Sequence, residues 1–285
     1  MTEIEKGLID TEAVKIADAE SPFWYTSGTI GPFFINTHYL YGSKETAEDL
    51  LSFIDTKMGK AGFRKELFDR VIDRYNSDRL FRTVMDIFYK KLSEDKYFKE
   101  SVYISGGERR DWFFSPVISH LSGKPHLFIG KDLSIYRCDD DQPVTDINGA
   151  VVTHIADLIT QASSYERAWI PAIKRINGVM GLSGAIVDRN QGGTDFLERS
   201  GVRSIKAVDI NDDFFRRLKD SGIIDSKQYV LIESFLKDPI GYGVKFIVEN
   251  PDFIYNSIKN NQNAKKIKFF FDNNPYNLSN IEDYR

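Results

Sequence analysis

Cysteine is nearly absent from this chain of 285 residues, since Cys138 is the only one. A single cysteine excludes an intramolecular disulfide framework and leaves too few thiolates for a structural zinc cluster. The four histidines lie in different predicted elements without the spacing of metal ligands, and His154 falls in a predicted buried strand, where a core histidine is expected. A chain without disulfides suits a reducing compartment, so we expect a cytoplasmic location.

Long apolar runs are also lacking. No stretch approaches the roughly 20 apolar residues of a membrane-spanning helix, and the charged residues 1–6 do not resemble a signal peptide, so no membrane span is expected. The chain has no excess of basic charge, because 38 basic residues stand against 42 acidic ones and the formal net charge is −4. This balance does not indicate nucleic-acid binding, and any anion site must therefore be local.

Hydrophobic residues make up 41% of the chain and aromatic residues 13%, enough for a substantial core. Short apolar runs, separated by helical patterns, follow one another in the middle of the sequence. They span residues 102–105, 125–129, 149–155, 181–187 and 203–208. This alternation predicts an α/β fold with a parallel sheet covered by helices on both faces.

The flanking segments show other patterns. Apolar residues at helical spacing predict a short helix over residues 11–19, and a Gly-Pro turn between aromatic runs predicts a hairpin-like arm over residues 23–36. A helix is predicted over 44–56, two or three over 63–99, and more after Asp209, whereas residues 259–280 have no clear period. We therefore expect an N-terminal helix and arm (1–57), a helical insertion (58–100), an α/β core (101–210) and a C-terminal helical extension (211–285).

Ligands of an open α/β sheet bind beyond the carboxyl ends of the strands, so the residues after each run carry the functional prediction. The run 149–155 is followed by Asp157 and then by Thr160, Gln161, Ala162, Ser163 and Ser164. Hydroxyls and free backbone N–H groups at a helix N-terminus can hold a phosphate, and the Asp157 carboxylate can hold ribose hydroxyls. The two serines would also form an ordinary helix cap, and for this segment alone the cap is the better interpretation.

Two further loops carry candidate residues. Gly106 and Gly107 permit a tight turn, after which Arg109 or Arg110 could neutralise a pyrophosphate; a surface turn with solvated arginines explains the loop equally well. Arg189 follows the run 181–187, where it could face a planar anionic substrate. That loop could also be only a turn between a strand and a helix.

In their order along the chain, these segments resemble the orotate phosphoribosyltransferases, members of the type I phosphoribosyltransferase family. The similar segments are residues 25–36 (substrate arm), 105–109 (pyrophosphate loop), 123–132 (strand leading to the catalytic lid), 155–160 (phosphoribosyl-pyrophosphate motif) and 188–193 (distal Asp-Arg segment). The resemblance covers roughly residues 23–208, except for the helical residues 63–99. It implies a type I phosphoribosyltransferase-like parallel sheet flanked by helices, with an N-terminal arm, a helical insertion and a C-terminal helical extension.

The resemblance also implies a function, the transfer of ribose 5-phosphate between phosphoribosyl pyrophosphate and a nitrogenous base. It implies Mg²⁺ as cofactor and a homodimer as the assembly. The implied substrate-binding residues are Asp157 for the ribose, Thr160, Gln161, Ala162, Ser163 and Ser164 for the 5-phosphate, Gly106, Gly107, Arg109 and Lys131 for the pyrophosphate, and Arg189 for the base. Asp157 and Lys131 are the implied catalytic residues.

The chain departs from the family pattern at several positions. Ala156 replaces the first of two successive acids, Ala162 replaces a glycine of the phosphate loop, and Ile30 replaces a lysine of the arm. Three consecutive aspartates, 139–141, stand in the lid, where they would repel a pyrophosphate. These departures favour an alternative prediction, a non-catalytic regulatory protein that keeps the fold and binds a nucleotide or phosphoribosyl pyrophosphate. A structural, partner-binding protein is the third possibility.

Overall fold

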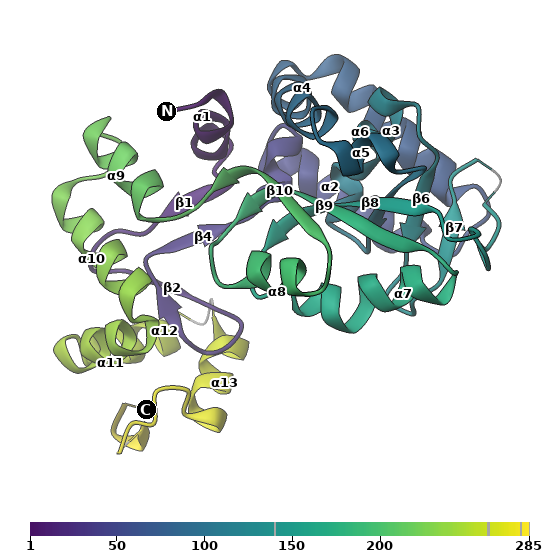
Figure 1. The fold of residues 1–285 in the computed structure, drawn as a ribbon. Coiled ribbons are helices and arrows are strands. Elements are labelled where there is room, and N and C mark those ends of the chain that lie inside the picture. Colours follow the sequence, from purple (N-terminus) through teal and green to yellow (C-terminus); the bar gives the residue numbers. More distant parts are fainter. Residues whose placement is uncertain (140, 261–262, 280, 285) are drawn as a thin grey trace. The chain divides into compact units, whose positions relative to one another are not determined.

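The computed structural model describes residues 1–139, 141–260, 263–279 and 281–284. They form two compact units (Figure 1). The first comprises residues 1–13 and 36–210, and the second comprises residues 14–35 and 211–285. This division differs from the four segments expected from the sequence, because the helical insertion shares a unit with the α/β core and the arm shares a unit with the C-terminal extension.

A six-stranded sheet forms the centre of the first unit, in the order β10-β9-β8-β5-β6-β7. Its strands are β5 (Tyr103–Gly107), β6 (His126–Ile129), β7 (Ile135–Arg137), β8 (Val151–Ile159), β9 (Val179–Asp188) and β10 (Arg203–Asp209). Neighbouring strands pair in parallel, except that β7 pairs with β6 in antiparallel fashion. The predicted α/β class with a mostly parallel sheet is confirmed, and the five predicted apolar runs are its five parallel strands.

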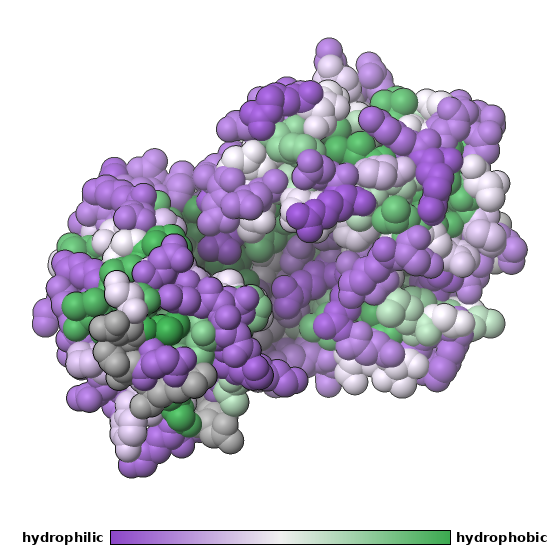
Figure 2. Space-filling view, turned by 90° about the horizontal axis from the view of Figure 1, so that it is seen from below, coloured by the Kyte–Doolittle hydropathy of each residue, from purple (hydrophilic) through white to green (hydrophobic). Residues whose placement is uncertain are grey.

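Helices cover both faces of this sheet, as Figure 1 shows, with α7 and α8 on one side and α3 to α6 on the other. The helices of this unit are α1 (Glu3–Asp10), α2 (Lys44–Lys57), α3 (Phe63–Ser77), α4 (Arg79–Ser93), α5 (Lys96–Glu100), α6 (Ser115–Ser122), α7 (Ile170–Arg175) and α8 (Gly193–Arg199). Among the described residues, no helix is long and apolar enough to cross a membrane. Hydrophilic residues cover most of the face seen in Figure 2.

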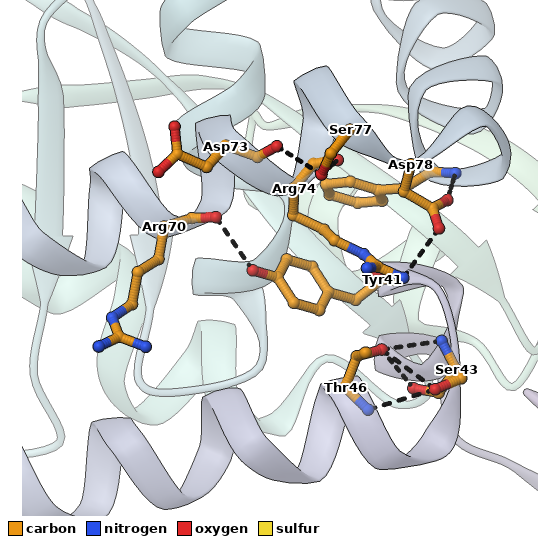
Figure 3. Close-up of polar contacts among 9 residues, drawn as sticks. Tyr41, Ser43, Thr46, Arg70, Asp73, Arg74, Ser77 and Asp78 are labelled. Atoms are coloured by element: carbon orange, nitrogen blue, oxygen red, sulfur yellow. Dashed lines mark hydrogen bonds and ion pairs between the residues drawn. The ribbon is translucent and has the colours of Figure 1, made fainter.

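The helices of the predicted insertion are fixed to residues 36–43 by polar contacts around Tyr41 (Figure 3). The Tyr41 hydroxyl donates to the carbonyl of Arg70 at 3.1 Å, and Arg74 Nε donates to the Tyr41 carbonyl at 2.7 Å. Arg74 also pairs at 2.8 Å with Asp78, whose carboxylate caps α4 by accepting the N–H of Phe81. One arginine thus joins α3, the start of α4 and the turn before α2.

The helix predicted over residues 11–19 is wrong. Helix α1 ends at Asp10, and Val14–Ile16 form strand β1, paired antiparallel with β4 (Phe33–Ile35) in the second unit. Val14 is buried and Lys15 exposed, so the apolar residues alternate with a polar one at the period of a strand. The spacing of four small apolar residues was compatible with a helix, but β-branched residues with a pairing partner favour the strand.

Aromatic side chains hold the second unit together. Strands β2 (Phe23–Trp24) and β3 (Ile30–Gly31) form the predicted hairpin-like arm, and Trp24 stacks on Phe253 with ring centroids 5.6 Å apart. The Tyr276 hydroxyl accepts the N–H of Ile30 at 2.7 Å. The helices are α9 (Asp212–Asp220), α10 (Ser226–Lys237), α11 (Pro239–Glu249), α12 (Asp252–Lys259) and α13 (Ala264–Asn273). Helix α13 lies where no period was evident in the sequence.

Candidate functional site

A pocket of about 270 Å³ lies where β5, β6 and β8 end. Seven of the predicted site residues line it: Arg109, Lys131, Asp157, Thr160, Ala162, Ser163 and Ser164. Gly106, Gly107, Gln161 and Arg189 are not among its lining residues. Segments 48 residues apart in sequence, at Arg109 and Asp157, thus meet at one edge of the sheet, as expected for parallel strands.

Asp157 stands inside β8, which continues to Ile159, four residues beyond the predicted end of the run. Its backbone N–H donates to Asp111 Oδ1 at 3.0 Å. Burial and the neighbouring carboxylate of Asp111 raise the pKa of Asp157 well above its ordinary value, while the guanidinium of Arg110 opposes the rise. This environment therefore favours a protonated Asp157, and a ligand that binds the carboxylate must compete with that proton.

The predicted phosphate loop, residues 160–164, keeps a turn that normally requires glycine. Ala162 has φ +58°, in the left-handed region, and it is only 4% exposed because it packs into the hydrophobic core beside Tyr165 and Leu197. The loop is closed by Gly193, whose N–H donates to the carbonyl of Thr160 at 2.9 Å. Ala162 also lines the pocket, which has a volume of about 270 Å³ with this alanine in place.

Ser163 and Ser164 are exposed at the pocket. They precede a π-helical turn, Tyr165–Trp169, for which Ser164 is the N-cap without a side-chain capping bond. The alternative interpretation, that these serines are an ordinary helix cap, is therefore not supported for Ser164. Hydroxyl groups at this position remain available to a ligand.

Gly106 and Gly107 are buried in β5 rather than exposed in a turn. A Cβ atom at Gly107 would overlap the indole of Trp169, and one at Gly106 would overlap the side chain of Ser115. Both glycines thus make room for core side chains. Gly107 still reaches the site indirectly, because its N–H donates to Asp111 Oδ2 at 2.9 Å.

Three cations line the pocket, and two of them are paired with carboxylates of the chain. Arg109 forms an ion pair with Asp55 of α2, and Lys131 lies 3.4 Å from Glu108. Arg110 is exposed, and within the described part of the chain its side chain has no hydrogen bond or ion pair. The sequence offered either arginine for an anion and we assigned Arg109; in the structure Arg110 is the cation that a ligand can use without breaking a pair.

Asp111 is a pocket residue that the sequence prediction missed. It follows the two arginines and opens a short 3₁₀ turn, Asp111–Phe113, and it is 6% exposed. Its carboxylate lies 3.4 Å from Nε2 of His154, a fully buried core histidine as expected. A carboxylate directly before the apolar residues 112–114 was the available sequence signal, because such a residue is buried only when it has partners.

The acidic stretch expected to form a lid is attached to the first unit away from the pocket. Residues 135–137 form β7, and Asp141 pairs with Arg64 of α3 at 2.5 Å and accepts the N–H of Gly62 at 3.1 Å. Of the described aspartates, 139 and 141, neither lines the pocket, and Asp140 lies outside the described residues. Neither Asp139 nor Asp141 thus contributes a negative charge to the pocket lining.

The remaining predicted residues lie beside the pocket. Gln161 is exposed, and the backbone N–H of Arg189 donates to the carbonyl of Ile159 at 3.0 Å. In the part of the chain that the structure describes, no group of three or more His, Cys, Asp or Glu residues could hold a metal ion. The described side chains therefore provide no complete Mg²⁺ site of their own.

No protein-family model and no curated protein sequence matches this chain. Solved structures do. UMP synthase from Leishmania donovani is 18% identical with a TM-score of 0.58 over 82% of this chain and 42% of its own length. Orotate phosphoribosyltransferase from Francisella tularensis is 12% identical with a TM-score of 0.53, over 82% of this chain and 97% of its own. Orotate phosphoribosyltransferase from Aeropyrum pernix is 16% identical with a TM-score of 0.50, over 75% of this chain and 98% of its own length.

This chain thus spans less than half of the UMP synthase but nearly the whole length of the two orotate phosphoribosyltransferases. At such identities the similarity concerns the fold. The order of the strands, the covered sheet and the pocket at their carboxyl ends agree with it, and the chain has a type I phosphoribosyltransferase fold of the orotate phosphoribosyltransferase kind.

Proposed function

We propose that the pocket binds phosphoribosyl pyrophosphate and that the protein transfers ribose 5-phosphate between this compound and a nitrogenous base. The observation that carries the proposal is the grouping of Asp157, the hydroxyl-bearing loop 160–164 and the cations Arg110 and Lys131 around one pocket at the end of the sheet. A ribose phosphate needs acceptors for its hydroxyls, donors for its phosphate and positive charge for its pyrophosphate. The pocket offers all three.

Each group has a role that follows from its chemistry. The Asp157 carboxylate accepts hydrogen bonds from the ribose hydroxyls, and the hydroxyls of Thr160, Ser163 and Ser164 donate to the 5-phosphate. Arg110, with Lys131, stabilises the charge that develops on the departing pyrophosphate. Catalysis would rest on positioning and charge stabilisation rather than on a covalent intermediate.

Mg²⁺ belongs to this proposal as a companion of the substrate. Because Mg²⁺ is commonly held by substrate phosphates and water, the lack of three suitable ligands among the described side chains is compatible with an ion that arrives on the pyrophosphate. The base, a homodimeric assembly and a cytoplasmic location remain predictions. Arg189, first assigned to the base, lies outside the pocket lining and would need a rearranged loop to reach it.

A second candidate is a protein that binds a ribose phosphate without turnover. One specific observation favours it, namely that Arg109 and Lys131 are already neutralised by Asp55 and Glu108. A pocket whose cations are engaged holds a pyrophosphate less tightly and stabilises its departure less. The two candidates share the ligand and differ in the chemical step.

Binding is tested by isothermal titration calorimetry with phosphoribosyl pyrophosphate and Mg²⁺. We expect binding by the wild type and a loss of about tenfold or more for Asp157→Asn, since hydrogen bonds to a charged group contribute about 1.5–3 kcal/mol. Asp195→Asn, in the first turn of α8 and outside the pocket lining, is the control and should bind as the wild type does. No heat of binding to a folded wild type would refute both candidates.

Turnover is tested by pyrophosphate release in the presence of a panel of purine and pyrimidine bases. Release that depends on one base, and that Arg110→Ala abolishes, is expected for the enzyme. Binding without release over the whole panel would refute catalysis and favour the non-catalytic candidate.

A further inference from the structure

A second cavity, of about 440 Å³, lies at the other end of β6 from the candidate functional site. His126, the first residue of β6, lines this cavity, whereas Lys131, two residues beyond the end of β6, lines the candidate functional site. The other lining residues of the cavity come from α3, α6 and the segments just before β6 and just after β7. The cavity therefore belongs entirely to the first unit.

The wall of this cavity is apolar and aromatic. The N–H of Cys138 donates to the carbonyl of His126 at 3.3 Å, so these two residues are opposite each other one step beyond the paired residues of β6 and β7. Residues in such a position place their side chains on the same face of the sheet. Phe68 of α3 lies edge-on to the His126 ring at 6.1 Å, and Pro125 adds a further apolar side chain.

The imidazole of His126 has one nitrogen without a partner. Nε2 lies 2.8 Å from Ser115 Oγ at the start of α6, whereas Nδ1 has no hydrogen-bond partner in the part of the chain that the structure describes. His126 is 2% exposed, and burial lowers its pKa to about 3, so the ring is neutral. A buried polar atom without a partner is unfavourable, and a ligand that supplies a hydrogen bond relieves this cost.

The charged residues of the lining are already engaged within the chain. Lys65 pairs with Asp69 at 2.6 Å, and Asp139 pairs with Arg137. The ammonium group of Lys124 donates to two backbone carbonyls at the end of α5. The two lysines and two aspartates of the lining also balance in charge. An ionised ligand would lose hydration without gaining a free partner, so these contacts favour an uncharged one.

We propose that this cavity is a binding site for a small uncharged molecule with an aromatic ring and one hydrogen-bonding group. The ring packs against Phe68, Pro125 and Cys138, and the polar group bonds to Nδ1 of His126. A volume of about 440 Å³ and an apolar wall with one polar anchor are typical of a small-molecule site. The inference is independent of the proposed function, because the two sites share no lining residue.

Cys138, the only cysteine, provides a reporter inside this cavity. The full-length protein is alkylated with iodoacetamide at pH 9, and the adduct is quantified over time by mass spectrometry. Burial raises the pKa of the Cys138 thiol to about 12, so the reaction is slow enough to follow. The probe is benzyl alcohol, which at this size binds with a Kd of about 1–10 mM. We expect about 20 mM of it to slow the alkylation at least twofold, and to leave the alkylation of free glutathione, the control, unchanged.

Three analogues of the probe test the chemistry of the ligand. Benzoate and benzylamine carry the same ring with a negative or a positive charge, and toluene lacks the hydroxyl group. We expect no protection of Cys138 by the charged analogues and at least threefold weaker protection by toluene. Protection by a charged analogue equal to that by benzyl alcohol would overturn the uncharged ligand, and equal protection by toluene would overturn the hydrogen bond to His126.

A matched pair of variants tests the location. Cys138→Phe should fill the cavity and Cys138→Ser should leave it open, so saturation-transfer NMR should detect benzyl alcohol on the wild type and on Cys138→Ser but not on Cys138→Phe. Equal transfer to Cys138→Phe would overturn the proposal. So would an alkylation rate of the wild type that benzyl alcohol does not change, a result that decides the question even if Cys138→Phe fails to fold. Protection that grows with protein concentration in the absence of the probe would show that a second copy of the chain covers the cavity, and would overturn the proposal as well.

Discussion

Replacing Ala162 by glycine should cost almost no stability, whereas the same change at Ala156 should destabilise the protein. The two alanines are buried to nearly the same extent, 4% and 2% exposed, so each loses about 0.8 kcal/mol of methyl burial and about 0.5–1 kcal/mol to the greater freedom of glycine in the unfolded chain. Only Ala162 has a positive φ, +58°, and relief of this conformation returns roughly 1–2 kcal/mol. We expect a loss of about 1.5 kcal/mol for Ala156→Gly and about zero for Ala162→Gly.

Urea unfolding, followed by tryptophan fluorescence, measures this difference. Trp112 and Trp169 belong to the same unit as both alanines, so their fluorescence reports on its unfolding. The stabilities of the three proteins can be compared if the slope of the unfolding free energy against urea concentration is the same in each. An Ala162→Gly variant as unstable as Ala156→Gly would refute the argument, because it would show that the loop carries no strain to relieve. A stable Ala162→Gly variant would show that the chain tolerates alanine there at a cost that the buried methyl group offsets.

Three further predictions concern other parts of the first unit. Gly42→Ala should lower the unfolding free energy by about 2 kcal/mol or more in thermal denaturation, because Gly42 has φ +137° and a Cβ would overlap the guanidinium of Arg74, whose charged hydrogen bonds would be lost. Asp157→Asn should be more thermostable than the wild type at pH 8 but not at pH 4. The pKa of Asp157 is raised from 3.8 to about 8 in the folded state, so the wild type loses stability as the pH rises between these two values. Equal pH profiles of the two proteins would contradict this. Asp55→Asn should tighten the binding of inorganic pyrophosphate by up to about fivefold in low-salt calorimetry, because Arg109 would no longer have to leave its ion pair with Asp55. An exposed pair of this kind contributes about 0–1 kcal/mol. An unchanged affinity would show that Arg109 does not reach the anion.

Four of the parallel strands, β5, β6, β8 and β9, could be predicted from the sequence because they are largely buried and are short, nearly continuous apolar runs. β10 is an edge strand and mostly half-buried, and its apolar residues Ile205 and Ala207 alternate with polar ones. The site followed from the same reasoning, since parallel strands place their carboxyl ends at one edge and thereby bring Asp157, Lys131 and the loop 160–164 together. β7 was missed because a three-residue antiparallel edge strand leaves almost no pattern.

The parts that the sequence did not predict depend on tertiary contacts. Residues 14–16 are a strand because Phe33–Ile35 pair with them, and α13 is a helix whose buried face, with Ile267 and Phe270, is recognisable only once its partners are known. The glycines 106 and 107 have an ordinary turn signature, yet they are glycines because Ser115 and Trp169 occupy the space of their side chains. Local pattern alone does not distinguish a glycine that permits a turn from one that permits close packing.

Ala156 and Asp111 belong to one physical problem, the burial of a second carboxylate near Asp157. Position 156 is 2% exposed inside β8, and its partner on β9 is Ala185, so an ionised carboxylate there would have an apolar neighbour. At position 111 a carboxylate accepts the N–H groups of Gly107 and Asp157. An acid beside Asp157 is therefore easier to bury at position 111 than at position 156, because hydrogen bonds to the charged group offset part of the cost of removing it from water.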